Sequence, residues 1–313
     1  MRVIVAGATG TLGMTLTEQL IAAGHSVIGL CRRPEGADRL TAIGAEPVVA
    51  DVLDEHGLLT ALTGHRADAV IHQATALSRM PITHSRLDET NALRDIGTSH
   101  LLLAAAAVGA RRFLTQSFFL GYGYRDHGSE PVTEEHLFGR PDGSAFDRHL
   151  RSMRSNEDQV FAARGIDGIA LRYGLFYGPE PTTRRFAAST RARRLPVPAR
   201  AGITSPIHIF DAAAATVAAL ERGRGGEAYN VADDCPLGFD DYIRAIARAS
   251  DAPEPRRIPG WLLRPAPYLY GLMVGTSIRL SNEKAKRELG WTPRYASCHE
   301  GLAALDVDDY QIR

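Results

Sequence analysis

Short apolar runs alternate with longer helical patterns through the first half of the chain. The runs are RVIVAG, HSVIGL, AEPVVA, DAVIHQ and RRFLTQS, and a later one is DGIALRYG. Between them, apolar residues recur at helical spacing over residues 12–23, 91–108 and 146–164. Because strands that are apolar on both faces are typical of parallel sheets covered by helices, the pattern predicts an α/β fold, a Rossmann-type doubly wound parallel sheet.

The pattern changes after Gly178. A segment rich in proline and arginine, YGPEPTTRRFAASTRARRLPVPARAG, interrupts the alternation of strands and helices. The stretch SPIHIFDAAAATVAAL then resumes strand and helix, which indicates a return to the main sheet. We therefore predict a larger α/β domain over residues 1–178 with 207–229 returning to it, and a smaller, discontinuous domain formed by 179–206 and 230–313.

The composition limits the kinds of partner that the protein can bind, but it says little about the reaction. Of 313 residues, 36 are basic and 36 acidic, so no net field attracts nucleic acid or an anionic membrane. The three cysteines, Cys31, Cys235 and Cys298, lack metal-ligand spacing and are odd in number, which argues against a metal site and a disulfide framework. The chain opens directly on a strand pattern, without an apolar leader. We expect a cytoplasmic protein that acts on a small molecule; the sequence leaves its oligomeric state open.

The turn after the first strand reads GATGTLG and carries three glycines, Gly7, Gly10 and Gly13. Between a strand and a helix, such glycines allow a tight turn and let the backbone amides approach a pyrophosphate. A tight turn without a ligand is the simpler alternative, but the order strand, glycines, helix favours dinucleotide binding. The residues expected at the phosphates are Gly7, Thr9, Gly10, Thr11, Leu12 and Gly13.

Two arginines follow the second strand, in GLCRRPEG. An acidic residue at this turn usually holds the ribose 2′-hydroxyl, whereas arginine favours the 2′-phosphate. Arg32 and Arg33 therefore predict NADP(H) in preference to NAD(H), which stays open as an alternative. After the third strand, Asp51 and Val52 are expected beside the adenine; a helix N-cap is the other role for this segment, and Asp54 could serve it equally well.

These features occur with HQAT (72–75), Asn91 followed by GTSHLLLAA, LRYGLFYGP, IHIFDAA, YNVADD and SNEKAKRELGW. Together, and in this order, they resemble the extended short-chain dehydrogenase/reductases of the epimerase/dehydratase branch. The resemblance covers nearly the whole chain. It implies cofactor contacts from Gln73, Ala74, Thr75 and Asn91, and a place for Tyr173 beside the nicotinamide. A buried tyrosine that bonds a backbone partner is the alternative role for Tyr173.

The same resemblance implies a serine or threonine that bonds the substrate oxygen, and Ser117 stands at the end of the corresponding strand. The family's Tyr-x-x-x-Lys, in which lysine lowers the tyrosine pKa, would fall on His149 and Met153. No tyrosine of this chain has a lysine four residues on, and lysine occurs only at 284 and 286. We therefore expect Ser117 to be catalytic and His149 to be either a proton donor or a structural residue.

Three functions are compatible with a missing Tyr/Lys pair. The first is reduction of a ketone that is already hydrogen-bonded to its own phenol, as in the atypical ketoreductases of aromatic polyketide pathways, which this chain resembles; those pathways make antibiotics. A catalytically silent NADP-binding regulator is the second. The third, a nucleotide-sugar epimerase or dehydratase, depends most on the absent tyrosine. We expect an NADPH-dependent ketoreductase acting on an angucyclinone or other quinone-type substrate.

Several aromatic residues are further candidates. Tyr122 and Tyr124 lie just past Ser117 and could act as alternative acids, although aromatic residues in such loops more often pack. Near the C-terminus, Trp261, Tyr268 and Tyr270 are spaced along one apolar face. That face could belong to the core or form a roof over a flat aromatic substrate.

Overall fold

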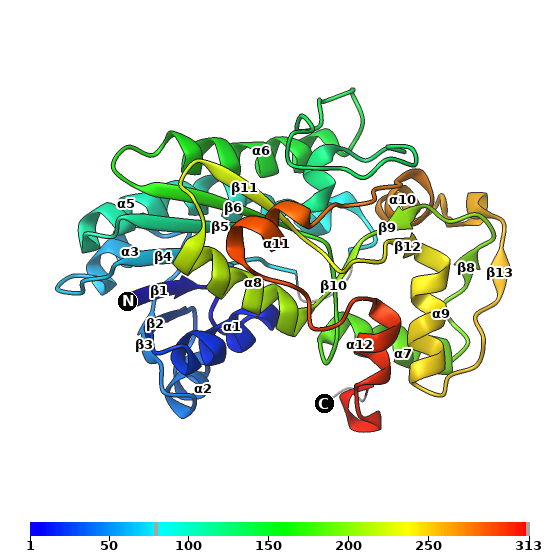
Figure 1. Cartoon of the computed structure of the whole chain (residues 1–313), viewed down its shortest axis with the longest axis horizontal. Helices are drawn as coiled ribbons and strands as arrows, with labels where there is room; N and C mark the ends of the chain where they lie inside the picture. Colours follow the sequence, from blue (N-terminus) through cyan, green and yellow to red (C-terminus); the bar gives the residue numbers. More distant parts are fainter. Residues whose placement is uncertain (78–80, 311–313) are drawn as a thin grey trace.

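The computed structural model describes residues 1–77 and 81–310. Its centre is a seven-stranded sheet with the order β11-β6-β5-β4-β1-β2-β3, in which every neighbouring pair is parallel. The Rossmann-type doubly wound sheet expected from the sequence is therefore confirmed (Figure 1). The strands are β1 (Arg2–Ala6), β2 (Ser26–Cys31), β3 (Glu46–Val49), β4 (Ala69–His72), β5 (Arg112–Phe118), β6 (Asp167–Tyr173) and β11 (Glu227–Val231).

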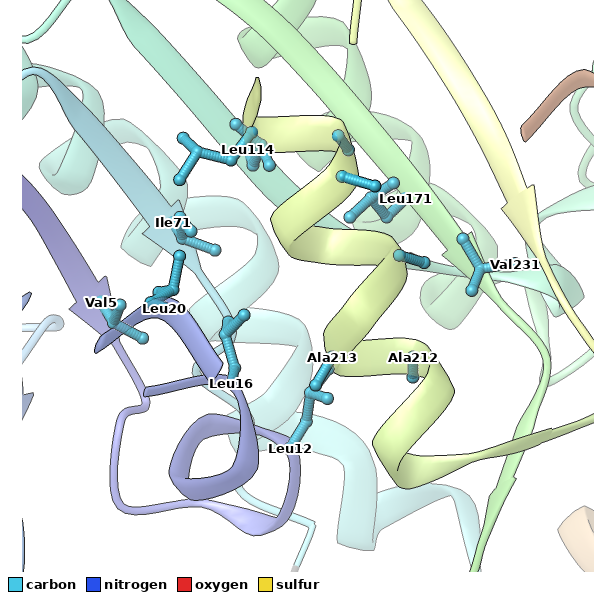
Figure 2. Close-up of a cluster of buried hydrophobic side chains, with 14 of the residues drawn as sticks. Val5, Leu12, Leu16, Leu20, Ile71, Leu114, Leu171, Ala212, Ala213 and Val231 are labelled. Carbon is cyan, nitrogen blue, oxygen red and sulfur yellow. The ribbon is translucent and has the colours of Figure 1, made fainter. Parts of the chain in front are cut away.

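Helices cover both faces of this sheet because its strands are apolar on both sides. One face carries α1 (Thr11–Ala22), α2 (Pro34–Ala42), α8 (Ile209–Arg222) and α11 (Glu283–Leu289). Figure 2 shows the core beneath them, where Leu12, Leu16 and Leu20 of α1 point toward Val5, Ile71 and the alanines of α8. The other face carries α3 (Glu55–Ala61), α5 (Thr98–Val108) and α6 (Asp147–Ala162).

The helix expected over residues 91–108 is longer and interrupted. It begins as the 3-10 turn η1 (His84–Leu87) and α4 (Asp88–Ala92), passes through a π-helical turn, η2 (Leu93–Gly97), and continues as α5. A π-helical turn holds one more residue than an α-helical turn, and such turns are frequent at functional sites.

The remaining elements pack as a second body beside the sheet, around a separate apolar cluster (Figure 1). Strand β7 pairs with β10, β9 with β12 and β8 with β13. The strands of this part are β7 (Leu175–Tyr177), β8 (Val197–Pro198), β9 (Ile203–Thr204), β10 (Pro206–His208), β12 (Leu237–Gly238) and β13 (Arg257–Ile258). Its helical elements are α7 (Pro181–Arg191), α9 (Phe239–Ala249), η4 (Gly260–Leu263), α10 (Pro267–Tyr270), η5 (Gly271–Gly275), α12 (Cys298–Ala303) and η6 (Val307–Tyr310).

The long connection from β5 to α6 contains only the 3-10 turn η3 (Phe119–Tyr122), yet it is anchored at several points. Asp126 and Val132 form bridges with Ser277 and Leu280 of the second body. Near its end, the Asp147 carboxylate accepts hydrogen bonds from the amides of Asp142 and Gly143. The chain therefore crosses from the sheet to the second body and back, which brings residues of both to one edge of the sheet. Among the described residues, no helix has both the length and the apolar character needed to cross a bilayer.

Candidate active site

A cavity of about 940 Å³ lies along the carboxyl edge of the central sheet. Its walls come from the turns after β1, β2, β3 and β4, from the end of β5, and from α7, α10 and η5 of the second body. Open parallel sheets bind ligands at this edge. Twelve of the residues predicted at the cofactor line it: Gly7, Thr9, Gly10, Thr11, Leu12, Arg32, Arg33, Asp51, Val52, Gln73, Ala74 and Thr75.

The glycine turn has the shape that a pyrophosphate requires. Gly7 has φ +81°, and a Cβ there would lie 2.7 Å from the backbone of Ala74. A Cβ on Gly13 would collide with the Gly7 carbonyl oxygen and lie 2.8 Å from Ala8. Helix α1 begins after Gly10, which offers no side-chain cap, and its first turn contains no acidic residue. The first-turn amides and the positive end of the helix dipole are thus left for an anion.

An orphaned acceptor further along the cavity also fits a dinucleotide. Gln73 is 5% exposed, and its Nε2 donates to the Tyr173 hydroxyl at 3.0 Å. Its Oε1 is buried without a hydrogen-bond partner in the described structure. Because a buried carbonyl oxygen without a donor is costly, this atom suits a hydroxyl or amide of a bound cofactor.

The basic turn after β2 contains a third arginine that the sequence interpretation missed. Arg39 of α2 lines the same part of the cavity as Arg32 and Arg33. Arg32 forms an ion pair with Glu89 at 2.7 Å, with both side chains more than half exposed. Glu35 also lines the cavity here. The end of the cavity that would hold the adenosine is therefore rich in arginine but not purely basic. Asp54, not Asp51, caps α3, by accepting from Gly57.

The structure does not bring Ser117 to the cavity. Along β5 successive side chains alternate between faces, and it is Gln116 and Phe118 that line the cavity. The Ser117 hydroxyl points the other way and donates to Glu157 Oε1 of α6 at 2.5 Å. With 2% exposure and this partner, Ser117 is placed to support the buried Glu157–Arg172 ion pair. The geometry does not support the expected contact with a substrate carbonyl.

His149 lies behind the cavity wall and does not line it. Its Nε2 is 3.0 Å from His84 Nδ1, and its Nδ1 accepts from the Asn91 amide at 3.0 Å. Asn91 in turn accepts from Ser152 at 2.9 Å, so its side chain belongs to this network, and it does not line the cavity. Burial, and then the neighbouring His84, lower the pKa of His149 to about 3. A neutral imidazole with both nitrogens bonded is a structural group, which is the alternative role left open above.

We expect His149 to stay neutral at every pH at which the protein functions. Its folded-state pKa lies below the ordinary value of about 6.5, so its contribution to stability is complete above that pH and is lost as the pH falls toward 3. NMR titration of the imidazole signals, assigned with a His149→Gln variant, should show no inflection for His149 between pH 8 and about 5. An inflection near pH 6.5 would restore it as a candidate proton donor.

Tyr173 is also absent from the cavity wall. It is fully buried, and its hydroxyl bonds to Gln73 and, at 2.6 Å, to Thr216 of α8. Burial raises its pKa. Beyond Gly174, Leu175 and Phe176 line the cavity instead. Tyr173 therefore reaches the site only through the orientation it gives Gln73.

The end of the cavity away from the glycine turn is an aromatic chamber, formed by Phe118, Tyr124, Tyr268 and Leu272 together with Arg94. The rings of Tyr124 and Tyr268 have centroids 6.1 Å apart, and Phe146 packs against both. Burial raises the pKa of Tyr124 and of Tyr268, so both phenols stay protonated. Neither lysine of the chain lines the cavity. The roof role considered for Tyr268 fits this position, whereas Trp261 is 59% exposed.

Sequence reasoning missed Arg94, although the pattern contained a signal for it. Leu87, Arg94 and Leu101 are seven residues apart, so they fall on one face of a helix. Both leucines are buried, and Arg94 is 8% exposed. Because arginine is seldom buried, an arginine on an apolar helix face is a signal of a site residue. Gln116 and Phe118 were missed as well. The signal for them was that side chains alternate along a strand, so these two lie on the opposite face of β5 from Ser117.

Comparison with known proteins places this site in a family. The profile of the NAD dependent epimerase/dehydratase family matches residues 3–232, which include the glycine turn and the whole carboxyl edge up to β11. The chain belongs to this family. The match supports an NAD(P) dinucleotide as the cofactor.

Two curated relatives align with nearly the whole length of this chain. A 3-diazoavenalumate denitrifying reductase from a Streptomyces species is 36% identical over 96% of this chain and 99% of the relative. A 4-hydroxy-2-methyl-3-oxo-4-farnesyl-3,4-dihydroquinoline-1-oxide ketoreductase from Stigmatella aurantiaca is 26% identical over 97% of this chain and 96% of the relative. The family match and these two relatives together show that the chain is an oxidoreductase.

Solved structures of the family share the fold. A nucleoside-diphosphate-sugar epimerase from Pseudomonas aeruginosa has a TM-score of 0.78 at 25% identity, covering 100% of this chain and 99% of its own. A UDP-glucose 4-epimerase from Thermus thermophilus, in complex with NAD, has a TM-score of 0.77 at 24% identity, covering 99% of both chains.

Proposed function

We propose that this protein is an NADPH-dependent ketoreductase that reduces a carbonyl of an aromatic polyketide, of the angucyclinone or quinone type, without a Tyr/Lys proton relay. The observation that supports it best is one cavity that connects the glycine turn with the aromatic chamber. A flat, ring-fused small molecule suits walls built from Phe118, Tyr124 and Tyr268. The Stigmatella relative is itself named a ketoreductase acting on a ring ketone.

Different residues of the cavity would each hold the part of the cofactor that matches them in charge or hydrogen bonding. The first-turn amides of α1 would bind the pyrophosphate, the arginines after β2 the 2′-phosphate, and Asp51 and Val52 the adenine. Gln73 Oε1 would accept a hydrogen bond from the nicotinamide half. When bound, the reduced nicotinamide supplies a hydride.

Reduction of a ketone also requires one proton, and no lysine-activated tyrosine is available to deliver it. A positioned general acid contributes about 10²–10⁴-fold. A hydroxyl adjacent to the ketone on the substrate ring can supply part of that effect, because it is already hydrogen-bonded to the carbonyl oxygen. The protonated phenol of Tyr268, which interacts with Tyr124, can donate a further hydrogen bond within the chamber. Its role is to orient and polarise the carbonyl.

The test is consumption of NADPH by the purified protein with angucyclinones and simpler quinones that carry a hydroxyl beside the carbonyl, with the alcohol product identified by mass. We expect turnover on these substrates and a loss of about 10²–10⁴-fold when that hydroxyl is methylated. Tight NADPH binding with no oxidation of any ketone would contradict the proposal and favour a cofactor-sensing regulator.

Reductive removal of a diazo group is a second candidate, favoured by the Streptomyces relative named for such a compound. Hydride addition to the carbon of an aryl diazonium forms a C–H bond as the C–N bond breaks, and N₂ leaves with the bonding pair. That reaction needs no proton, so a site without the Tyr/Lys pair is sufficient. Including an aryl diazonium in the same assay and measuring N₂ release separates the two candidates.

We expect the Arg32→Ala/Arg33→Ala double variant to lose most of its preference for NADPH over NADH. Each charge-assisted hydrogen bond to a 2′-phosphate is worth about 1.5–3 kcal/mol before discounting for the exposure of these side chains, so the ratio of kcat/KM values should fall by about tenfold or more. Arg140→Ala, an exposed arginine away from the cavity, is the control. An unchanged ratio would remove the two arginines as selectors.

A further inference from the structure

Arg94 is the buried cation of the aromatic chamber. It lies in the π-helical turn η2, is 8% exposed, and lines the cavity. Its backbone carbonyl accepts from Thr98, as a helical residue can. In the described part of the chain, no hydrogen bond or ion pair engages its guanidinium, and its nitrogens are not among the fully enclosed atoms that lack partners. The guanidinium is therefore turned toward the space of the cavity.

The groups that surround this guanidinium leave its charge uncompensated. From the β5–α6 connection and α10 come the phenols of Tyr124 and Tyr268. From β4 and α6 come His72 and His149, whose pKa values burial lowers to about 4 and about 3, so both are neutral. None of these groups carries a negative charge at neutral pH. A buried arginine without an anion is costly and rare in proteins, so the arrangement suits a ligand that brings the anion.

The cavity contains other arginines, but they differ in this respect. Arg184 is half-buried, and its Nε donates to the Asp309 carbonyl oxygen at 2.7 Å. Arg32, in the turn after β2, forms an ion pair with Glu89. Arg94 alone among these three combines burial with a position beside the Tyr124 and Tyr268 rings.

We propose that Arg94 binds a carboxylate on the aromatic substrate, so that the enzyme selects ring systems that carry an acidic group. This inference rests on the proposed function insofar as the same chamber holds the aromatic ring. A planar guanidinium matches a carboxylate through two parallel hydrogen bonds. The adjacent phenol rings provide apolar surface for the ring system. Arg94 is thus a specificity-determining residue, separate from the arginines expected at the cofactor phosphates.

The experiment measures binding, not turnover. Calorimetric titration of the protein loaded with NADP⁺ compares 4-hydroxycinnamate with its methyl ester, which lacks the negative charge and adds one methyl group. We expect the acid to bind about 10- to 100-fold more tightly than the ester. In Arg94→Met that preference should disappear while the affinity for the ester stays the same, and Arg94→Lys should restore part of it because lysine keeps the charge without the planar fork.

Arg184→Met is the matched control, because it removes an arginine of the same cavity whose guanidinium already has a partner; the preference for the acid should persist. Equal binding of acid and ester by the unmodified protein, or an undiminished preference in Arg94→Met, would overturn the inference. Weaker binding of NADP⁺ itself in Arg94→Met would also overturn it, since Arg94 would then serve the cofactor. If the preference depends on Arg94 but no ketone or diazonium is reduced, the proposed function fails and this inference stands.

Discussion

Arg172→Met should lower the free energy of unfolding by about 3–5 kcal/mol, the loss typical of breaking a buried ion pair from one side. Arg172 contacts both carboxylate oxygens of Glu157, with Nη2–Oε2 at 2.6 Å and Nε–Oε1 at 3.0 Å. The two side chains are only 9% and 3% exposed. Removing the guanidinium leaves the Glu157 carboxylate buried with little beyond the Ser117 hydroxyl to compensate it. Urea unfolding followed by circular dichroism measures the effect.

Two control variants separate the effect of breaking a buried ion pair from the effect of removing an arginine charge. Arg2→Met breaks an ion pair with Glu46 that is nearly half exposed on both sides, and it should cost at most about 1 kcal/mol. The double variant Arg172→Met/Glu157→Leu should recover much of the loss, because no buried charge is left unpaired. If Arg172→Met and Arg2→Met destabilise the protein equally, the network around Glu157 is not the support we describe. Arg172 also donates to Tyr122, which donates to Asn230, so this network ties β5, β6 and β11 together.

We expect Gly13→Ala to weaken NADPH binding by at least about 100-fold, or roughly 2.7 kcal/mol. A Cβ at this position meets the backbone of Gly7 and Ala8, which cannot rotate away as a side chain can. Helix α1 must therefore move off the turn, and its first-turn amides no longer converge on one phosphate position. Fluorescence or calorimetric titration with NADPH measures the change.

Gly275→Ala is the matched control for the glycine prediction, because nothing lies within 4 Å of a Cβ built at Gly275. Its affinity for NADPH should match that of the unmodified protein. Near-native affinity in Gly13→Ala would show that the turn has room to adjust. The close approach between α1 and β1 would then not be what shapes the anion site.

Local signals were enough to place the predicted cofactor residues along one cavity. The apolar runs marked the strands of the central sheet, and the turns that follow them necessarily meet at one edge of a parallel sheet. The glycine turn, Arg32, Asp51 and Gln73 were therefore found at the cavity from their positions after strands alone. Gly13 does not line the cavity, but it sets the distance between the turn and α1.

Three site residues that the family resemblance implied could not be placed in the same way. Ser117 was assigned by its place at the end of a strand, but the two-residue alternation turned its hydroxyl toward Glu157. Asn91 was assigned to the cofactor, but its side-chain amide bonds His149 of α6. Tyr173 was assigned beside the nicotinamide, but it does not line the cavity, and its hydroxyl bonds Gln73 and Thr216 of α8. Each difference depends on a neighbour distant in sequence.

The sequence by itself determined the order of strands and helices, the anion-binding turn and the absence of a tyrosine paired with lysine, since these depend on residue type and short spacing. Only the tertiary structure decided which face of β5 meets the cavity, that His149 is enclosed by His84 and Asn91, and that Tyr268 closes the chamber over Arg94. The physical reason is that periodicity specifies which side chains share a face, whereas the partner packed against that face is chosen by long-range contacts between distant segments.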